Sequence, residues 1–124
     1  MFVYADNAAT TRVLPKVLEA MLPYFTEQYG NPSSTYPLGQ EASRALIGSR
    51  ETIAGLLGCR PGEITFTSGG SEADNQILRT AATWGKKQGR THLISSAIEH
   101  HAILHTLEAL QAEGFTVTLL PVNR

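Results

Sequence analysis

The chain has 124 residues, of which 42% are hydrophobic, and its 10 Lys and Arg against 11 Asp and Glu give a net charge of -1. This composition supports a packed core and excludes a disordered chain, and the lack of a basic cluster argues against nucleic-acid and membrane-surface partners. The single cysteine, Cys59, excludes a disulfide framework and predicts a reducing, cytoplasmic setting, and no signal-peptide pattern or ~20-residue apolar span is seen.

The first half of the chain predicts helices joined by polar loops. An extended entry at 2–5 and a polar loop at 6–11 precede apolar residues that recur on one helical face: Val17, Leu18, Met21, Leu22 and Phe25. Pro15 suits the first turn of this helix, and Pro23 should end or kink it. After a loop at 27–37, apolar positions from Leu38 onward keep a helical period until Gly58, a typical helix-ending glycine.

The second half predicts strands that alternate with helices. Three strands are expected, at 64–67, 91–96 and 115–121, with helices at 71–85 and 100–113 between them. The apolar stripe of the first of these helices is Ala73, Ile77, Leu78 and Ala81. The βαβαβ order predicts an α/β fold with a parallel sheet. A third strand that arrives three residues before Arg124 leaves an open sheet edge, which favours the front part of a larger α/β domain, or one completed by another chain.

The turn from Ser68 to Ser71 lies between a predicted strand and a predicted helix, in the stretch ITFTSGGSEADNQ. Such a turn places free backbone N–H groups and the positive end of a helix dipole at the ligand-binding edge of the sheet. Two readings remain open. Either Gly70 and Ser71 bind a phosphate, or Ser71 only caps the helix, with Glu72 and Asp74 complementing the dipole.

Histidines follow the second predicted strand, in SAIEHHAIL. From its position, His100 is either a group that contacts a planar ligand and moves protons, or a solvated surface residue. His101 and His105 have a spacing compatible with a metal, but no HExxH motif or third ligand accompanies them, so no metal site is predicted. The polar loops at 6–11 and 29–39 are either simple turns or a binding mouth, and Cys59 is read as an incidental thiol.

Four linked motifs, YADNAATT, YGNPSSTYPLG, ITFTSGGSEADN and SSAIEHHAIL, occur in this order over nearly the whole chain. Together they closely resemble the N-terminal part of the cysteine desulfurases of the NifS/IscS kind, which are pyridoxal-phosphate (PLP) enzymes of fold type I in the class V aminotransferase group. The resemblance implies removal of sulfur from L-cysteine to leave alanine and an enzyme-bound persulfide. It also implies a homodimer, and a sulfur-acceptor protein such as an iron–sulfur scaffold.

The resemblance also implies roles for three residues. Gly70 and Ser71 match the cradle of the PLP phosphate, with Ser71 where a threonine is common, and His100 matches the histidine that stacks on the pyridine ring. On this interpretation residues 1–15 are an N-terminal arm and loop, and residues 16–124 are the first part of the large PLP-binding domain.

Several family features have no counterpart in the chain. Tyr36 stands where the family often has histidine, and the Schiff-base lysine, the pyridine-binding aspartate, the persulfide cysteine and the carboxylate-binding arginine are expected further along. By position Lys16, Lys86, Lys87 and Cys59 do not replace them. The fragment alone is therefore expected to be inactive. The alternatives are another class V enzyme, such as a selenocysteine lyase or small aminotransferase, and a non-catalytic truncated module.

Overall fold

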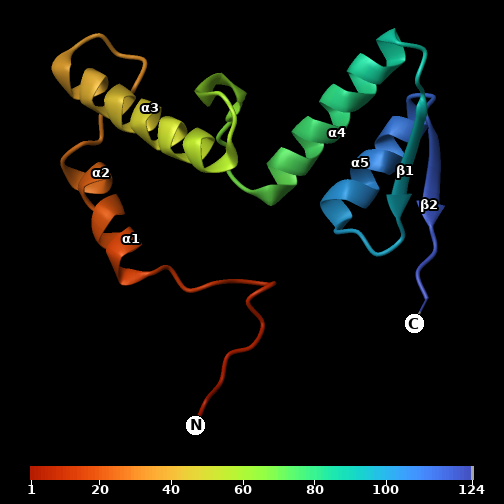
Figure 1. The fold of residues 1–124 in the computed structure, drawn as a ribbon, viewed down its shortest axis with the longest axis horizontal. Coiled ribbons are helices and arrows are strands. Elements are labelled where there is room, and N and C mark those ends of the chain that lie inside the picture. Colours follow the sequence, from red (N-terminus) through yellow and green to blue (C-terminus); the bar gives the residue numbers. More distant parts are fainter. Residues whose placement is uncertain (124) are drawn as a thin grey trace. The chain divides into compact units, whose positions relative to one another are not determined.

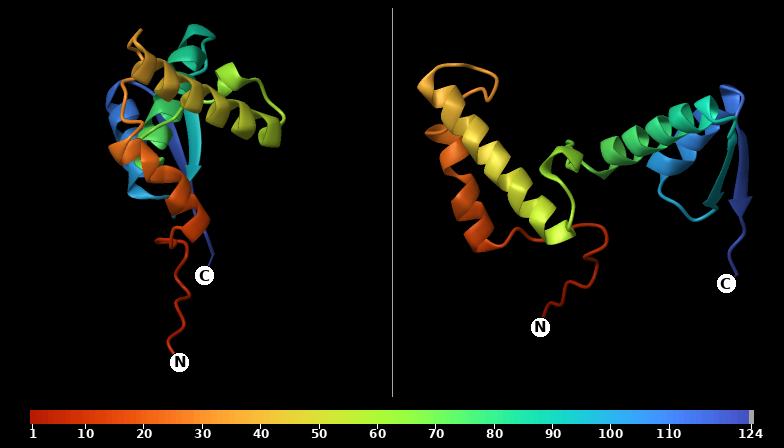
Figure 2. Two further views of the ribbon diagram at one scale, coloured as in Figure 1. Left: turned by 90° about the vertical axis from the view of Figure 1, so that its left-hand side faces the viewer. Right: turned by 45° about the horizontal axis from the view of Figure 1, so that its top comes forward.

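The computed structural model describes residues 1–123, which form two compact units, Met1–Thr65 and the part from Phe66 onward (Figure 1). The first unit is helical, and both strands lie in the second unit (Figure 2). The α/β character of the chain therefore resides in the second unit. Within residues 1–123, no helix combines the length and the apolar character needed to cross a membrane.

The helices of the first unit begin at prolines. They are α1 (Pro15–Met21), α2 (Pro23–Thr26), α3 (Pro37–Leu57) and the short 3₁₀ helix η1 (Pro61–Glu63). Proline suits the first helical position because its fixed φ matches the helix and its missing N–H would have had no partner there. The predicted break at Pro23 and the predicted end at Gly58, which has φ of 69°, are both confirmed.

The loop between α2 and α3 is held close to the start of α3. The side chain of Asn31 accepts a hydrogen bond from the Ser33 N–H at 2.9 Å, and the Gln40 side chain donates to the Thr35 carbonyl at 2.7 Å. A Cβ atom on Gly30 would lie 2.2 Å from the Leu38 carbonyl oxygen, so only glycine permits this approach. The loop therefore packs against the start of α3.

The second unit contains α4 (Gly70–Lys87), β1 (His92–Ser96), α5 (His101–Ala112) and β2 (Thr116–Leu120). The strands pair in parallel, with His92 opposite Thr116 and Ser96 opposite Leu120. The predicted helices and the two later strands are thus confirmed, as is the helix-ending glycine Gly114, with φ of 95°.

The core of this unit lies where the two helices meet the sheet. Ala82 of α4, Leu110 of α5 and Phe115 are almost fully buried, and Leu78 and Leu93 pack against them. The predicted stripe on α4 was partly wrong, because Ile77 is 66% exposed and the buried face continues through Ala82 instead. Packing on α5 selects that face, which spacing alone does not identify.

The predicted strand at Ile64–Thr67 is wrong for the residues described. This segment forms no strand, and the sheet of the described residues contains only β1 and β2. A strand is defined by its hydrogen-bonded neighbour, and β-branched sequence alone supplies none. The α/β class is confirmed, whereas the predicted three-stranded core becomes a two-stranded parallel pair. The division of the chain at residues 15 and 16 stays a prediction.

Candidate functional site

Helix α4 begins at Gly70, the second of the two glycines of the turn. Its N-cap is Gly69, which supplies no side chain, and the backbone N–H groups of Gly70, Ser71 and Glu72 have no acceptor among the described residues. The alternative in which Ser71 only caps the helix is therefore wrong, because Ser71 is already the second helical residue. Free N–H groups at the positive end of an 18-residue helix favour an anion.

The nearby carboxylate does not occupy this position. The Ser68 N–H and the Ser68 hydroxyl both donate to one carboxylate oxygen of Glu72, each at 2.6 Å. The Ser68 hydroxyl and then the Ser68 N–H lower the pKa of Glu72 below its usual value. Glu72 is thus folded back onto Ser68, four residues earlier, and it stays ionised while it holds the turn in shape.

We expect Ser68→Ala to raise the pKa of Glu72 partway toward its usual value, because the hydroxyl is the larger cause of the shift and the N–H donor remains. A carboxyl group whose pKa is lowered by folding stabilises the fold above its unfolded pKa, and loses that contribution as pH falls through the folded value. NMR titration of the Glu72 carboxyl carbon measures the change. Glu63, whose pKa is lowered by Arg60, serves as the control and should not move.

His100 begins helix α5 from the N-cap position. Its ring nitrogen Nδ1 accepts a hydrogen bond from the Ala102 N–H at 3.1 Å. In the neutral ring, the hydrogen is consequently on Nε2, which has no partner among residues 1–123. One nitrogen of His100 therefore fixes the helix start, while the other is available to a ligand.

Ser71 and His100 line the same pocket of the second unit. Its volume is about 380 Å³, which is within the usual range for small-molecule sites. Sequence reasoning brought Ser71 and His100 to one edge of the sheet, and the structure does bring them to one pocket. The sequence did not predict that Asn75, Arg79 and Thr106 also line this pocket, because their positions depend on how α4 and α5 pack.

Two further histidines, His101 and His105, also line this pocket. The rings of His101 and His105 are stacked with centroids 5.4 Å apart, and the ring of His101 is tilted against that of His100 at 6.1 Å. In the described part of the chain, no three His, Cys, Asp or Glu side chains are grouped so that they could hold a metal ion.

Arg79, which also lines this pocket, is paired with Glu113 at 3.2 Å, at an exposed position.

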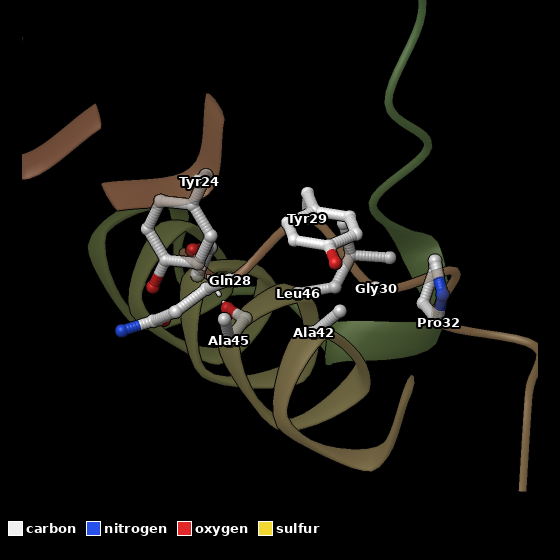
Figure 3. Close-up of a pocket in the computed structure, with 9 residues that line it drawn as sticks. Tyr24, Gln28, Tyr29, Gly30, Pro32, Ala42, Ala45 and Leu46 are labelled. Carbon is white, nitrogen blue, oxygen red and sulfur yellow. Dashed lines mark hydrogen bonds between the residues drawn. The ribbon is translucent and has the colours of Figure 1, made fainter. Parts of the chain in front are cut away.

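The two predicted polar loops belong to the first unit and contribute nothing to the lining of this pocket. The loop at 6–11 is closed by its own turn bonds, such as the Ala9 N–H to the Asp6 carbonyl at 3.1 Å. The loop at 29–39 borders a second pocket, of about 390 Å³. Figure 3 shows Tyr24, Gln28 and Tyr29 beside α3, the helix that supplies Ala42, Ala45 and Leu46.

The chain matches the class-V aminotransferase family over residues 3–124. The chain belongs to this family. It is 52% identical over 121 residues to the cysteine desulfurase IscS of Clostridium botulinum (strain Kyoto / Type A2), covering 98% of this chain and 30% of that relative. A solved structure described as a NifS-like protein is 44% identical, with a TM-score of 0.89 over 98% of this chain and 33% of that chain.

A second solved structure, described as SspA in complex with cysteine, is 40% identical, with a TM-score of 0.85 over 94% of this chain and 33% of that chain. The chain therefore spans about a third of the length of these relatives. Class V aminotransferases and cysteine desulfurases are PLP-dependent, so the family requires a place for a phosphate and an aromatic ring.

The residues of the pocket fit such a group. The open N–H groups of Gly70 and Ser71 and the Ser71 hydroxyl are donors suited to a phosphate, and Glu72 is held by Ser68. A Cβ atom built on Gly69 or Gly70 would meet nothing within 4 Å, so the space in front of the turn is open. The His100 ring borders the same space.

Proposed function

We propose that the chain is the N-terminal part of a PLP-dependent cysteine desulfurase, which converts L-cysteine to L-alanine and passes the sulfur on as a persulfide. One observation carries this proposal: the phosphate-type turn at Ser71 and the imidazole of His100 border one pocket. The relative described as a complex with cysteine supports the choice of substrate.

Within this proposal, Gly70, Ser71 and His100 hold the cofactor, and His100 also serves proton transfer. The N–H groups of Gly70 and Ser71 and the Ser71 hydroxyl bind the 5′-phosphate of PLP, which the dipole of α4 further stabilises. His100 packs its ring against the pyridine ring, and its Nε2 holds or moves a proton beside the substrate. PLP itself, when bound, supplies an electron-withdrawing ring that stabilises negative charge on the substrate.

The chain offers no lysine near this pocket within its second unit. Lys86 and Lys87 lie in the last turn of α4, and Lys87 is about 24 Å along the helix axis from Ser71. Lys86 is engaged with the Phe115 ring, 5.6 Å from its centroid. We therefore propose that the Schiff-base lysine, and the persulfide cysteine with it, come from the part of the enzyme that follows in the relatives.

A direct expectation follows for the 124-residue chain. With one equivalent of PLP and then borohydride, we expect no single lysine to become labelled stoichiometrically, because the lysines of the second unit, Lys86 and Lys87, lie at the far end of α4 from the phosphate turn. Peptide mass spectrometry measures the labelling. Selective, near-complete labelling of Lys16, Lys86 or Lys87 would contradict this assignment, whereas low labelling spread over surface lysines is the background.

The proposed function is tested in a reconstituted enzyme, in which this chain is followed by the downstream two thirds of the Clostridium botulinum relative. We expect PLP uptake and release of equal amounts of alanine and transferable sulfur from L-cysteine. A protein that binds no PLP would overturn the proposal. Turnover of selenocysteine without cysteine would favour the selenocysteine-lyase alternative.

The wider setting is part of the same proposal. The enzyme would act as a homodimer in the cytoplasm. The single cysteine and the lack of a basic patch are compatible with the cytoplasmic setting. Its sulfur would pass to an acceptor protein for iron–sulfur cluster or thio-cofactor synthesis. Size measurement of the reconstituted enzyme by light scattering tests the dimer.

A further inference from the structure

A partly buried hydrogen bond joins the two helices that carry the proposed cofactor residues. Thr106 of α5 is 3% exposed, and its hydroxyl donates to the side-chain oxygen of Asn75 on α4 at 2.7 Å. The two residues are 31 positions apart in the sequence. The bond therefore depends on tertiary packing: Asn75 ends the third motif, whereas Thr106 lies outside all four.

Each partner of this bond also reaches back toward the pocket. The Asn75 side-chain nitrogen donates to the Ser71 carbonyl at 2.8 Å. The Thr106 hydroxyl also lies 2.7 Å from the carbonyl of Ala102, the residue whose N–H donates to His100 Nδ1. A continuous series of contacts thus runs from Ser71 through Asn75, Thr106 and Ala102 to His100.

The other side-chain bond between the two helices is weaker. Arg79 and Glu113 are about half exposed, and exposed ion pairs contribute little to stability. The Asn75–Thr106 bond is partly buried. Breaking it leaves the side-chain oxygen of Asn75 without this partner, which costs more than the loss of an exposed contact. Asn75 lies only about 6 Å along α4 from Ser71. A shift or rotation of α5 at this contact therefore moves His100 away from the phosphate-binding turn.

We propose that Asn75 and Thr106 are positioning residues, which set the distance between the phosphate-binding turn and His100. This inference rests on the proposed function and adds to it two residues of the pocket lining, whose role is to hold α4 and α5 together. Their effect is transmitted by the first turns of α4 and α5. A small displacement of groups that must act together is enough to lower affinity and rate.

The test is Thr106→Val in the reconstituted enzyme, because valine keeps the shape of threonine and removes only the donor. We expect the affinity for PLP to fall about tenfold, as expected for one buried acceptor left unpaired. Thr106→Ser, which keeps the hydroxyl, should restore it. The ³¹P resonance of bound PLP should also shift in Thr106→Val and return in Thr106→Ser.

A matched control separates this effect from the loss of a helix hydroxyl. Thr52 of α3 donates to the Gly48 carbonyl at 2.9 Å, the same contact one turn back, but it makes no bond to another helix. Thr52→Val should leave PLP affinity unchanged. In the apoprotein, hydrogen exchange at 100–106 should quicken in Thr106→Val only.

A double-variant cycle then tests whether the two residues act through one bond. Asn75→Ala combined with Thr106→Val should weaken PLP binding no more than the stronger single change. Normal affinity and normal exchange in Thr106→Val, or fully additive effects in the cycle, would overturn the inference. If the parent enzyme binds no PLP, the proposed function fails instead, and the apoprotein exchange still decides the role of Thr106 between the helices.

Discussion

Replacing His100 by alanine in the reconstituted enzyme is expected to lower turnover of L-cysteine by about 10²-fold or more, the usual contribution of a positioned proton-transfer group. The ring that borders the pocket is lost, together with the free Nε2 nitrogen. The fold should survive, because within the described residues the side chain makes one hydrogen bond at the start of α5 and one tilted ring contact with His101. Alanine release and circular dichroism measure the two effects separately.

His100→Asn separates these two tasks within one residue. Asparagine is a favoured N-cap, so this variant should recover the roughly 0.5–1 kcal/mol of stability that His100→Ala loses, while activity stays low. His101→Ala is the neighbouring control, and should retain more activity than His100→Ala because the proposal gives His101 no task at the cofactor. Normal turnover in His100→Asn would remove His100 from the reaction and leave it as a helix cap.

Ser71→Ala is expected to weaken PLP binding about tenfold to a hundredfold, because a hydrogen bond to a charged phosphate is lost. No hydrogen bond of the Ser71 hydroxyl to the described residues is recorded, so the apoprotein should keep its stability. Titration with PLP, followed by absorbance and by ³¹P NMR, measures the affinity.

Ser71→Thr is the matched variant, since threonine keeps the hydroxyl, and it should bind PLP normally. Ser49→Ala controls for the loss of a serine hydroxyl elsewhere, because Ser49 donates only to the Ala45 carbonyl within α3. Unchanged affinity in Ser71→Ala would mean that the backbone N–H groups bind the phosphate without help from the side chain.

Local chemistry made much of the fold predictable. Pro15, Pro23 and Gly58 act through their own backbone preferences, so their effects on the first helices were confirmed without tertiary information. The helix after the two glycines is likewise where the pattern places it. The strand at Ile64–Thr67 was wrong because its identity depends on a neighbouring strand, which the β-branched sequence does not reveal.

The residues of the candidate site also fall into those that local sequence predicts and those that depend on tertiary packing. Ser71 and His100 follow from turn chemistry and from the four motifs, and they meet in one pocket. The double use of the His100 ring was not foreseen, because it depends on the exact direction of one N–H group at the start of α5. Asn75 and Thr106 were missed because neither residue carries a signal until two helices are packed together.

The two-stranded sheet has a consequence for protein synthesis. Within residues 1–123, β1 and β2 pair only with each other, and Ile94 and Leu120 are 64% and 52% exposed. In relatives three times as long, such a ribbon leaves the ribosome while most of the enzyme is still untranslated. Open apolar edges at that stage invite pairing with other nascent chains, so chaperone capture during translation should matter most for this region.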